Sequence, residues 1–247
     1  MSKVLQRFFI LLIILFSLVG NTQNFFYHLM PKQPEVNFTT GSQTANESIG
    51  IFAPDWHSNV SAWTKRRKIE ITPATTALTN YPMLIKLDST KISYASLQAA
   101  AQDLRFVDGT GTVLAYEIEN WNASGESNIW VKVPSIAASP TVTYIWMYYG
   151  NATAPDAQSA PGTWSNSFAK VINFKGTAGN PIANATTLTS SIGNDMVAYN
   201  AGGAGMSFIN GMINTAVQTD GLDDWIDIGA DASLNFTAST PFTFSVG

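Results

Sequence analysis

Two acidic residues, Glu117 and Glu119, come closest in this chain to the type and spacing of an acid–base pair. Residues two apart on a strand share one face, and the strand rise separates their Cα atoms by about 6.5 Å. Glycosidases place two carboxyl groups at comparable separations, but a working pair needs two different environments. Lys132 and Lys86 can serve as ordinary cross-strand partners for both acids. We therefore expect exposed, noncatalytic glutamates and no catalytic residue.

A second acidic group lies in one turn and the strand that follows it. Carboxylate oxygens are the ligands that hard cations such as Ca²⁺ prefer, although the spacing is not that of an EF-hand loop. Calcium is the one cofactor that this group suggests, and solvated turn carboxylates are the alternative. The candidate metal ligands are Asp220, Asp223, Asp224 and Asp227.

Aromatic residues supply a third kind of candidate site. Trp121 and Trp130 share their strand faces with Glu and Lys rather than with aliphatic residues, so each is expected on a polar strand face. An exposed indole there can stack on a sugar ring, and packing into the core is the alternative. We expect these two residues to be the ligand-binding ones.

Other catalytic or cofactor chemistry has little support in the sequence. The two histidines, His28 and His57, fall in an N-terminal segment and a polar tether, so they predict neither a zinc site nor a triad. Gly109 and Gly111 lie in a hairpin with no helix after it, which excludes a dinucleotide fingerprint. The absence of cysteine excludes disulfides, thiolate metal sites and a cysteine nucleophile.

The elements that position these residues are expected to be strands. Alternating or apolar runs are separated by turn sequences, with a hairpin at 108–111, and the run 142–149 is apolar on both faces, as in a central strand. Only 92–102, rich in alanine, favours a helix. The pattern predicts an all-β chain of two tandem β-sandwich modules. Expected strands of the first module are 63–71, 81–88, 104–107, 113–121, 129–133 and 142–149.

Four motifs in the first module carry a family resemblance. In order they are DLRFVDGTG, AYEIENWN, NIWVKVP and YIWMYYGN, after an opening strand that begins at Trp63. They resemble family 2341 of the domains of unknown function over about 63–151. That family recurs in large secreted proteins, often just before a laminin-G-like sandwich. The resemblance implies a fold and an extracellular location, and no reaction.

The second module, 164–247, follows a linker at 152–163 that is rich in Pro, Ala and Ser. Its last forty residues resemble the start of laminin-G-like (concanavalin A-like) modules, many of which bind glycans, often with calcium, while others are structural. Such modules need roughly twice this length. We therefore expect a fragment with an incomplete second module, and chain-to-chain contact that completes this module is the alternative. The resemblance is carried by Gly211, Ala216, Asp220, Gly221 and Trp225.

The N-terminal segment predicts export. Lys3 and Arg7 precede the apolar run 8–19, so 1–30 is expected to be a signal peptide or, if uncleaved, a membrane anchor. The polar, aperiodic stretch 31–61 is expected to be a disordered linker. We expect an extracellular or cell-surface protein.

Composition agrees with this assignment. Only 12% of the 247 residues are charged, 12% are aromatic, and the formal net charge is -4, a balance typical of extracellular β proteins that argues against nucleic acid. The sequence predicts a binding or adhesion protein that recognises a polysaccharide or glycoprotein glycan. The alternatives are a noncatalytic part of a larger carbohydrate-active enzyme and a structural spacer of the cell envelope.

Overall fold

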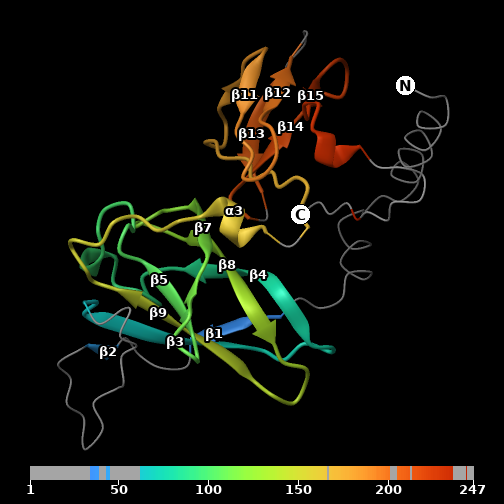
Figure 1. The fold of residues 1–247 in the computed structure, drawn as a ribbon. Helices are drawn as coiled ribbons and strands as arrows, with labels where there is room; N and C mark the ends of the chain where they lie inside the picture. The colour runs from blue at the N-terminus through green and yellow to red at the C-terminus, as the bar shows by residue number, and fades with distance from the viewer. Residues whose placement is uncertain are drawn as a thin grey trace, which may run out of the picture. The chain divides into compact units, whose positions relative to one another are not determined.

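The computed structural model describes residues 34–38, 43–44, 62–165, 167–200, 205–211, 213–235 and 243. The predicted leader and most of the predicted linker 31–61 lie outside these residues. The strands and short helices described below belong to one compact unit, Val36–Gly247. This unit is nearly all β and contains several separate sheets, which confirms the expected fold class (Figure 1). None of the helices in the described ranges is long and apolar enough to cross a membrane.

The first module is built from two antiparallel sheets. Alternating residues of both sheets face a common core, which includes Ile69, Met147, Ile85 and Val131. The larger sheet has the order β1(Val36–Phe38), β3(Lys65–Ile71), β9(Thr143–Tyr149), β5(Arg105–Asp108) and β6(Val113–Leu114), with β2(Gln43–Thr44) also paired to β3; the smaller has the order β4(Leu78–Leu87), β8(Ser127–Ile136) and β7(Tyr116–Asn120).

Two local predictions for this module are confirmed. Strand β9 lies between β3 and β5, the central position that its apolar run predicts. The hairpin at 108–111 joins β5 to β6, where Gly111 has φ +95° and the Asp108 carboxylate accepts hydrogen bonds from the backbone N–H groups of Thr110 and Thr112, each at 2.9 Å. An Asp carboxylate and a glycine with positive φ are the usual chemistry of such turns.

Two other predictions are wrong. The expected helix at 92–102 is reduced to a 3-10 turn, η2(Tyr94–Ser96), because Asp103 captures the backbone N–H of Gln98 at 2.9 Å and Ala101 has φ +56°. A helix this short has little intrinsic stability to oppose such contacts. The expected strand 113–121 is divided in two, since β6 pairs with β5 in one sheet and β7 pairs with β8 in the other.

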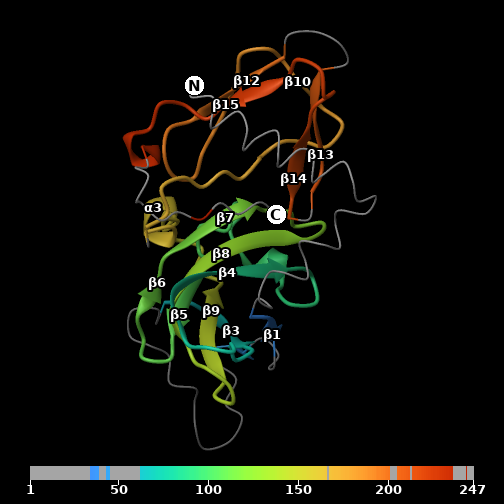
Figure 2. The same cartoon turned by 90° about the vertical axis from the view of Figure 1, so that its right-hand side faces the viewer.

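The second module contains two smaller antiparallel sheets. Between them lies a core of five buried residues, Ile182, Leu188, Met196, Ala198 and Met206. Figure 2 shows β12 and β15, which pair in register. One sheet has the order β10(Pro181–Ile182), β13(Met206–Asn210) and β14(Thr215–Gln218), and the other β11(Thr186–Leu188), β12(Met196–Tyr199) and β15(Trp225–Asp227). Two short helices, α3(Ala160–Thr163) and η3(Ala232–Leu234), flank these sheets in the sequence.

Candidate functional site

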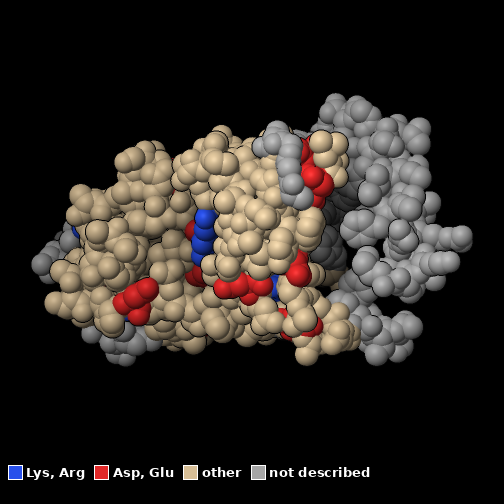
Figure 3. Space-filling model, turned by 90° about the horizontal axis from the view of Figure 1, so that it is seen from above, with Lys and Arg blue, Asp and Glu red and all other residues tan. Residues whose placement is uncertain are grey.

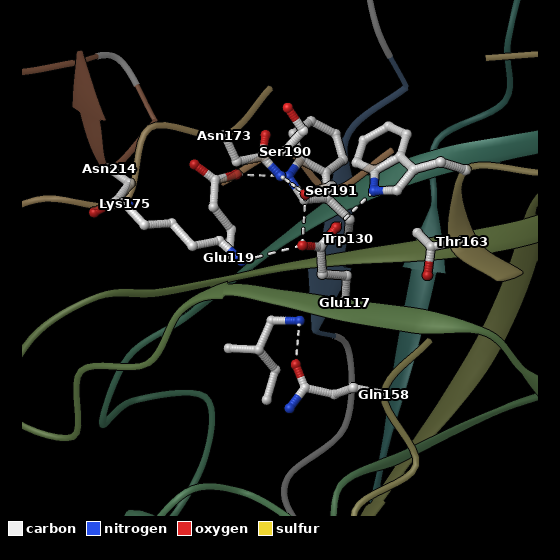
Figure 4. Close-up of polar contacts among 12 residues, drawn as sticks. Glu117, Glu119, Trp130, Gln158, Thr163, Asn173, Lys175, Ser190, Ser191 and Asn214 are labelled. Carbon is white, nitrogen blue, oxygen red and sulfur yellow. Dashed lines mark hydrogen bonds and ion pairs between the residues drawn. The ribbon is translucent and has the colours of Figure 1, made fainter. Parts of the chain in front are cut away.

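Glu117 lies on β7 and is buried, with 5% of its surface exposed. Its Oε2 atom accepts a hydrogen bond from the Trp164 indole at 2.6 Å. Its Oε1 atom accepts one from the Ser191 hydroxyl at 2.7 Å and forms an ion pair with Lys175 at 3.1 Å (Figure 4). Burial of a carboxylate is costly unless it is hydrogen-bonded and paired, and both oxygens of Glu117 meet this requirement. The expectation of an exposed Glu117 is therefore wrong.

Glu119 is also buried, with 8% exposed. The Trp130 indole donates to its Oε2 atom at 2.6 Å. Burial raises the pKa of Glu119 above its ordinary value, and the neighbouring charge of Glu117 adds to this effect, while the Trp130 hydrogen bond and Lys175 oppose it. The expected partners of the two glutamates bind elsewhere, since Lys132 donates to the Ser165 hydroxyl at 2.6 Å and Lys86 pairs with Glu126 at 3.0 Å.

These contacts form one assembly, which we term the polar cluster. Its two carboxylates come from one strand, and three of its partners come from the segment 164–191, which lies far along the chain (Figure 4). The glutamates have different environments, as an acid–base pair requires. However, the oxygens of Glu117 are both occupied by groups of the same chain, which is the arrangement of a structural hydrogen-bond network. The cluster consists of Glu117, Glu119, Trp130, Trp164, Lys175 and Ser191.

The two tryptophans expected to bind ligand are both half-buried. Trp121 packs against the core of the first module, and its ring meets Tyr94 edge-on at a centroid distance of 5.1 Å. Trp130 belongs to the polar cluster and lies 5.1 Å from the Trp164 ring. Their indoles therefore already have packing partners within the chain, and sugar stacking on them stays a prediction.

The structure brings three of the four predicted metal ligands together. Carboxylate oxygens of Asp220, Asp223 and Asp224 lie within 4.8 Å of one another. Asp227 stands apart from this group, and its Oδ1 atom accepts from the Gly229 backbone N–H at 2.8 Å. Because Ca²⁺ takes six to eight oxygen ligands, three carboxylates fit part of its coordination shell. Calcium binding stays a prediction for these three residues.

A stacked aromatic pair, of which one member is exposed, was missed by the sequence reasoning. Tyr199 on β12 and Trp225 on β15 are register partners, and their rings stack at 4.9 Å with an interplanar angle of 18°. Trp225 is 52% exposed. The signal was present in the sequence, since Trp225 alternates with Asp223 and Asp227, which is the pattern of a solvent-facing strand side.

Comparison with known proteins identifies a family for this chain but no similar protein of known structure. The family model described as a domain of unknown function (DUF2341) matches residues 100–225, just over half of the 247-residue chain. The chain belongs to the DUF2341 family. No curated protein and no solved structure matches it.

The matched DUF2341 region differs in extent from the expected 63–151. It starts near β5, continues through the expected linker 152–163, and ends at the first residue of β15. Every member of the polar cluster lies within the match, together with both residues of the stacked pair. The laminin-G-like character of the second module stays a prediction.

Proposed function

We propose that this DUF2341 chain is an exported, noncatalytic binding protein that recognises glycans through the outer face of its second module. The observation that carries the proposal is the Tyr199–Trp225 stack. An indole that is 52% exposed leaves a large apolar area in water, and tryptophan is enriched at binding surfaces because it joins an apolar body to a polar tip.

The position of Trp225 suits the stacking of a sugar ring. One ring face lies against Tyr199, and β15 is an outer strand in the order β11, β12, β15. A pyranose ring presents an apolar face of C–H groups, and placing it on the remaining indole face buries apolar area of both partners. Asp227 shares the sheet face with Trp225 and adds a carboxylate that accepts hydrogen bonds from sugar hydroxyls.

The sequence also supports the proposed export and the proposed type of binding module. The basic residues and apolar run at 3–19 support export, with retention at the membrane as the alternative. The laminin-G-like pattern around Asp220, Gly221 and Trp225 supports a glycan-binding module. Protease treatment of intact cells tests the location: loss of the region 63–247, while a cytosolic marker stays intact, supports export, and protection of both overturns it.

A glycan array followed by calorimetry on the hits tests the binding function. The matched control for Trp225→Ala is Tyr144→Ala, because Tyr144 is also an exposed aromatic residue, at 39%, but lies in the first module. We expect binding by the wild type and by Tyr144→Ala, and its loss in Trp225→Ala. Absence of any glycan ligand, or equal binding by all three chains, overturns the proposal.

A second candidate, a structural spacer of the cell envelope, is favoured by the polar cluster. Hydrogen bonds from Trp164 and Ser191 to Glu117, buried and partly buried respectively, join the two parts of the chain sequence that carry separate cores. A spacer requires such connections and no ligand. An intact, stable chain that binds nothing on the array would support this second candidate.

A further inference from the structure

The stacked aromatic pair lies in an acidic C-terminal part of the chain. Between Trp164 and Asn235 the sequence has two lysines, no arginine and six aspartates, a formal charge of -4 that equals the formal charge of the whole chain. On the face drawn in Figure 3, acidic side chains are more abundant than basic ones. The six aspartates are Asp195, Asp220, Asp223, Asp224, Asp227 and Asp231.

The two lysines of this part both interact within the chain. Lys175 forms its ion pair with Glu117. Lys170 donates to the backbone carbonyl of Ile228 at 3.0 Å and to that of Asn194. Lys170 keeps its charge and offsets part of the negative charge beside Asp227 and Asp231, but the formal charge of -4 already counts both lysines, so an excess of negative charge remains in this part of the chain.

Trp225 and Asp227 combine two features that attract a cation. An exposed indole face attracts cations through its ring quadrupole, and Asp227 is an exposed carboxylate on the same side of β15. A ligand that places an amino group beside a flat, apolar ring would satisfy both residues at once. A carboxylated or sulfated ligand would meet repulsion from the surrounding aspartates.

We propose that the Tyr199–Trp225 surface takes a glycan that carries free amino groups, such as a glucosamine oligomer, in preference to neutral or anionic glycans. This inference rests on the proposed glycan-binding function and names its ligand class. One pyranose ring continues the Tyr199–Trp225 stack, and an ammonium group lies beside Asp227. The preference depends on charge, so it weakens as salt is added.

Calorimetry with oligosaccharides of equal length tests the ligand class. The probes are a glucosamine oligomer, its N-acetylated form, a galacturonate oligomer and an oligolysine peptide. A mildly acidic buffer keeps the sugar amines protonated while most aspartates stay ionised. A chelator keeps calcium from neutralising the aspartates. Each titration is run at low and at high salt.

We expect the glucosamine oligomer to bind about tenfold tighter than its N-acetylated form at low salt, from one cation–π contact and weak exposed ion pairs. High salt should remove most of this difference. Asp227→Asn should reduce the preference severalfold. Glu126→Gln, which removes one exposed charge in the first module, should leave it unchanged.

The outcomes separate this inference from the function on which it rests. Equal binding of the amino and N-acetylated oligomers, or tighter binding of galacturonate, overturns the amino-sugar preference and leaves glycan binding intact. Oligolysine binding as tight as that of the glucosamine oligomer overturns the sugar assignment in favour of a cationic peptide. No binding of any glycan, here or on the array, overturns both proposals.

Discussion

Replacing Glu117 by glutamine is expected to destabilise the chain strongly, because the substitution removes the acceptor at the centre of the polar cluster. The wild-type carboxylate uses separate oxygens for Trp164 and Ser191, at 2.6 and 2.7 Å. A glutamine amide has one oxygen and one NH₂ group, so it can accept from only one of these two donors. The Trp164 indole can only donate, so it takes the amide oxygen, and the NH₂ group then faces the Ser191 hydroxyl, which must turn to accept from it, and the Lys175 ammonium, which it repels.

The magnitude follows from these contacts. A hydrogen bond to a charged group contributes about 1.5–3 kcal/mol and a neutral one about 0.5–1.5 kcal/mol, so both hydrogen bonds weaken when glutamine replaces Glu117. The ion pair with Lys175 adds no more than about 1 kcal/mol, since that lysine side chain is 46% exposed. We expect Glu117→Gln to lower the free energy of unfolding by about 2–4 kcal/mol, which corresponds to about 4–16 °C in Tm for a chain of this size.

Urea unfolding followed by tryptophan fluorescence measures this loss, and Trp130 and Trp164 lie within the cluster as reporters. Lys175→Met is the matched control, because it removes the ion pair and keeps both hydrogen bonds between neutral donors and Glu117. It should cost no more than about 1 kcal/mol. If Glu117→Gln costs no more than Lys175→Met, the polar cluster does not stabilise the fold as argued.

Three further predictions concern pH, a buried aspartate and calcium. Burial raises the pKa of Glu119 above its ordinary value of 4.5. The folded chain therefore holds this proton more tightly than the unfolded chain, and stability falls as pH rises from 4.5 through the folded-state pKa. Glu119→Gln should flatten the stability profile above pH 4.5, and an unchanged profile refutes this. Asp103 is 1% exposed, and its carboxylate accepts hydrogen bonds from the backbone N–H groups of Gly150 and Asn151 at 2.8 and 3.0 Å. Asp103→Asn should therefore lower the free energy of unfolding by about 2–3 kcal/mol. An unchanged Tm in thermal unfolding would contradict this prediction. Calcium at about a hundred times its Kd should stabilise the wild type by about 2.7 kcal/mol and Asp223→Asn by much less; an equal Tm with and without calcium contradicts the metal site.

The sequence alone determined the fold class and several local structures. Alternation of apolar residues placed Ile69, Ile85 and Val131 in a core, because side chains of a strand point to opposite faces. The hairpin at 108–111 and the central strand β9 were also predictable, since turn chemistry and a two-sided apolar run depend on neighbouring residues only. The stacked pair was partly readable in the same way, from the alternation of Trp225 with aspartates.

The tertiary structure decided what these elements face. On the strand, Glu117 and Glu119 follow the same alternation as solvent-exposed acids, and nothing within ten residues of them signals burial. The environment of Glu117 comes from partners 47, 58 and 74 residues further along the chain, at Trp164, Lys175 and Ser191. The donor to Glu119 is Trp130, 11 residues further along on the neighbouring strand. The helix expected at 92–102 failed for the same reason, because Asp103 binds the Gln98 N–H and buries its carboxylate against Gly150. Local patterns specify periodicity, whereas burial and hydrogen-bond partners depend on which distant segments meet.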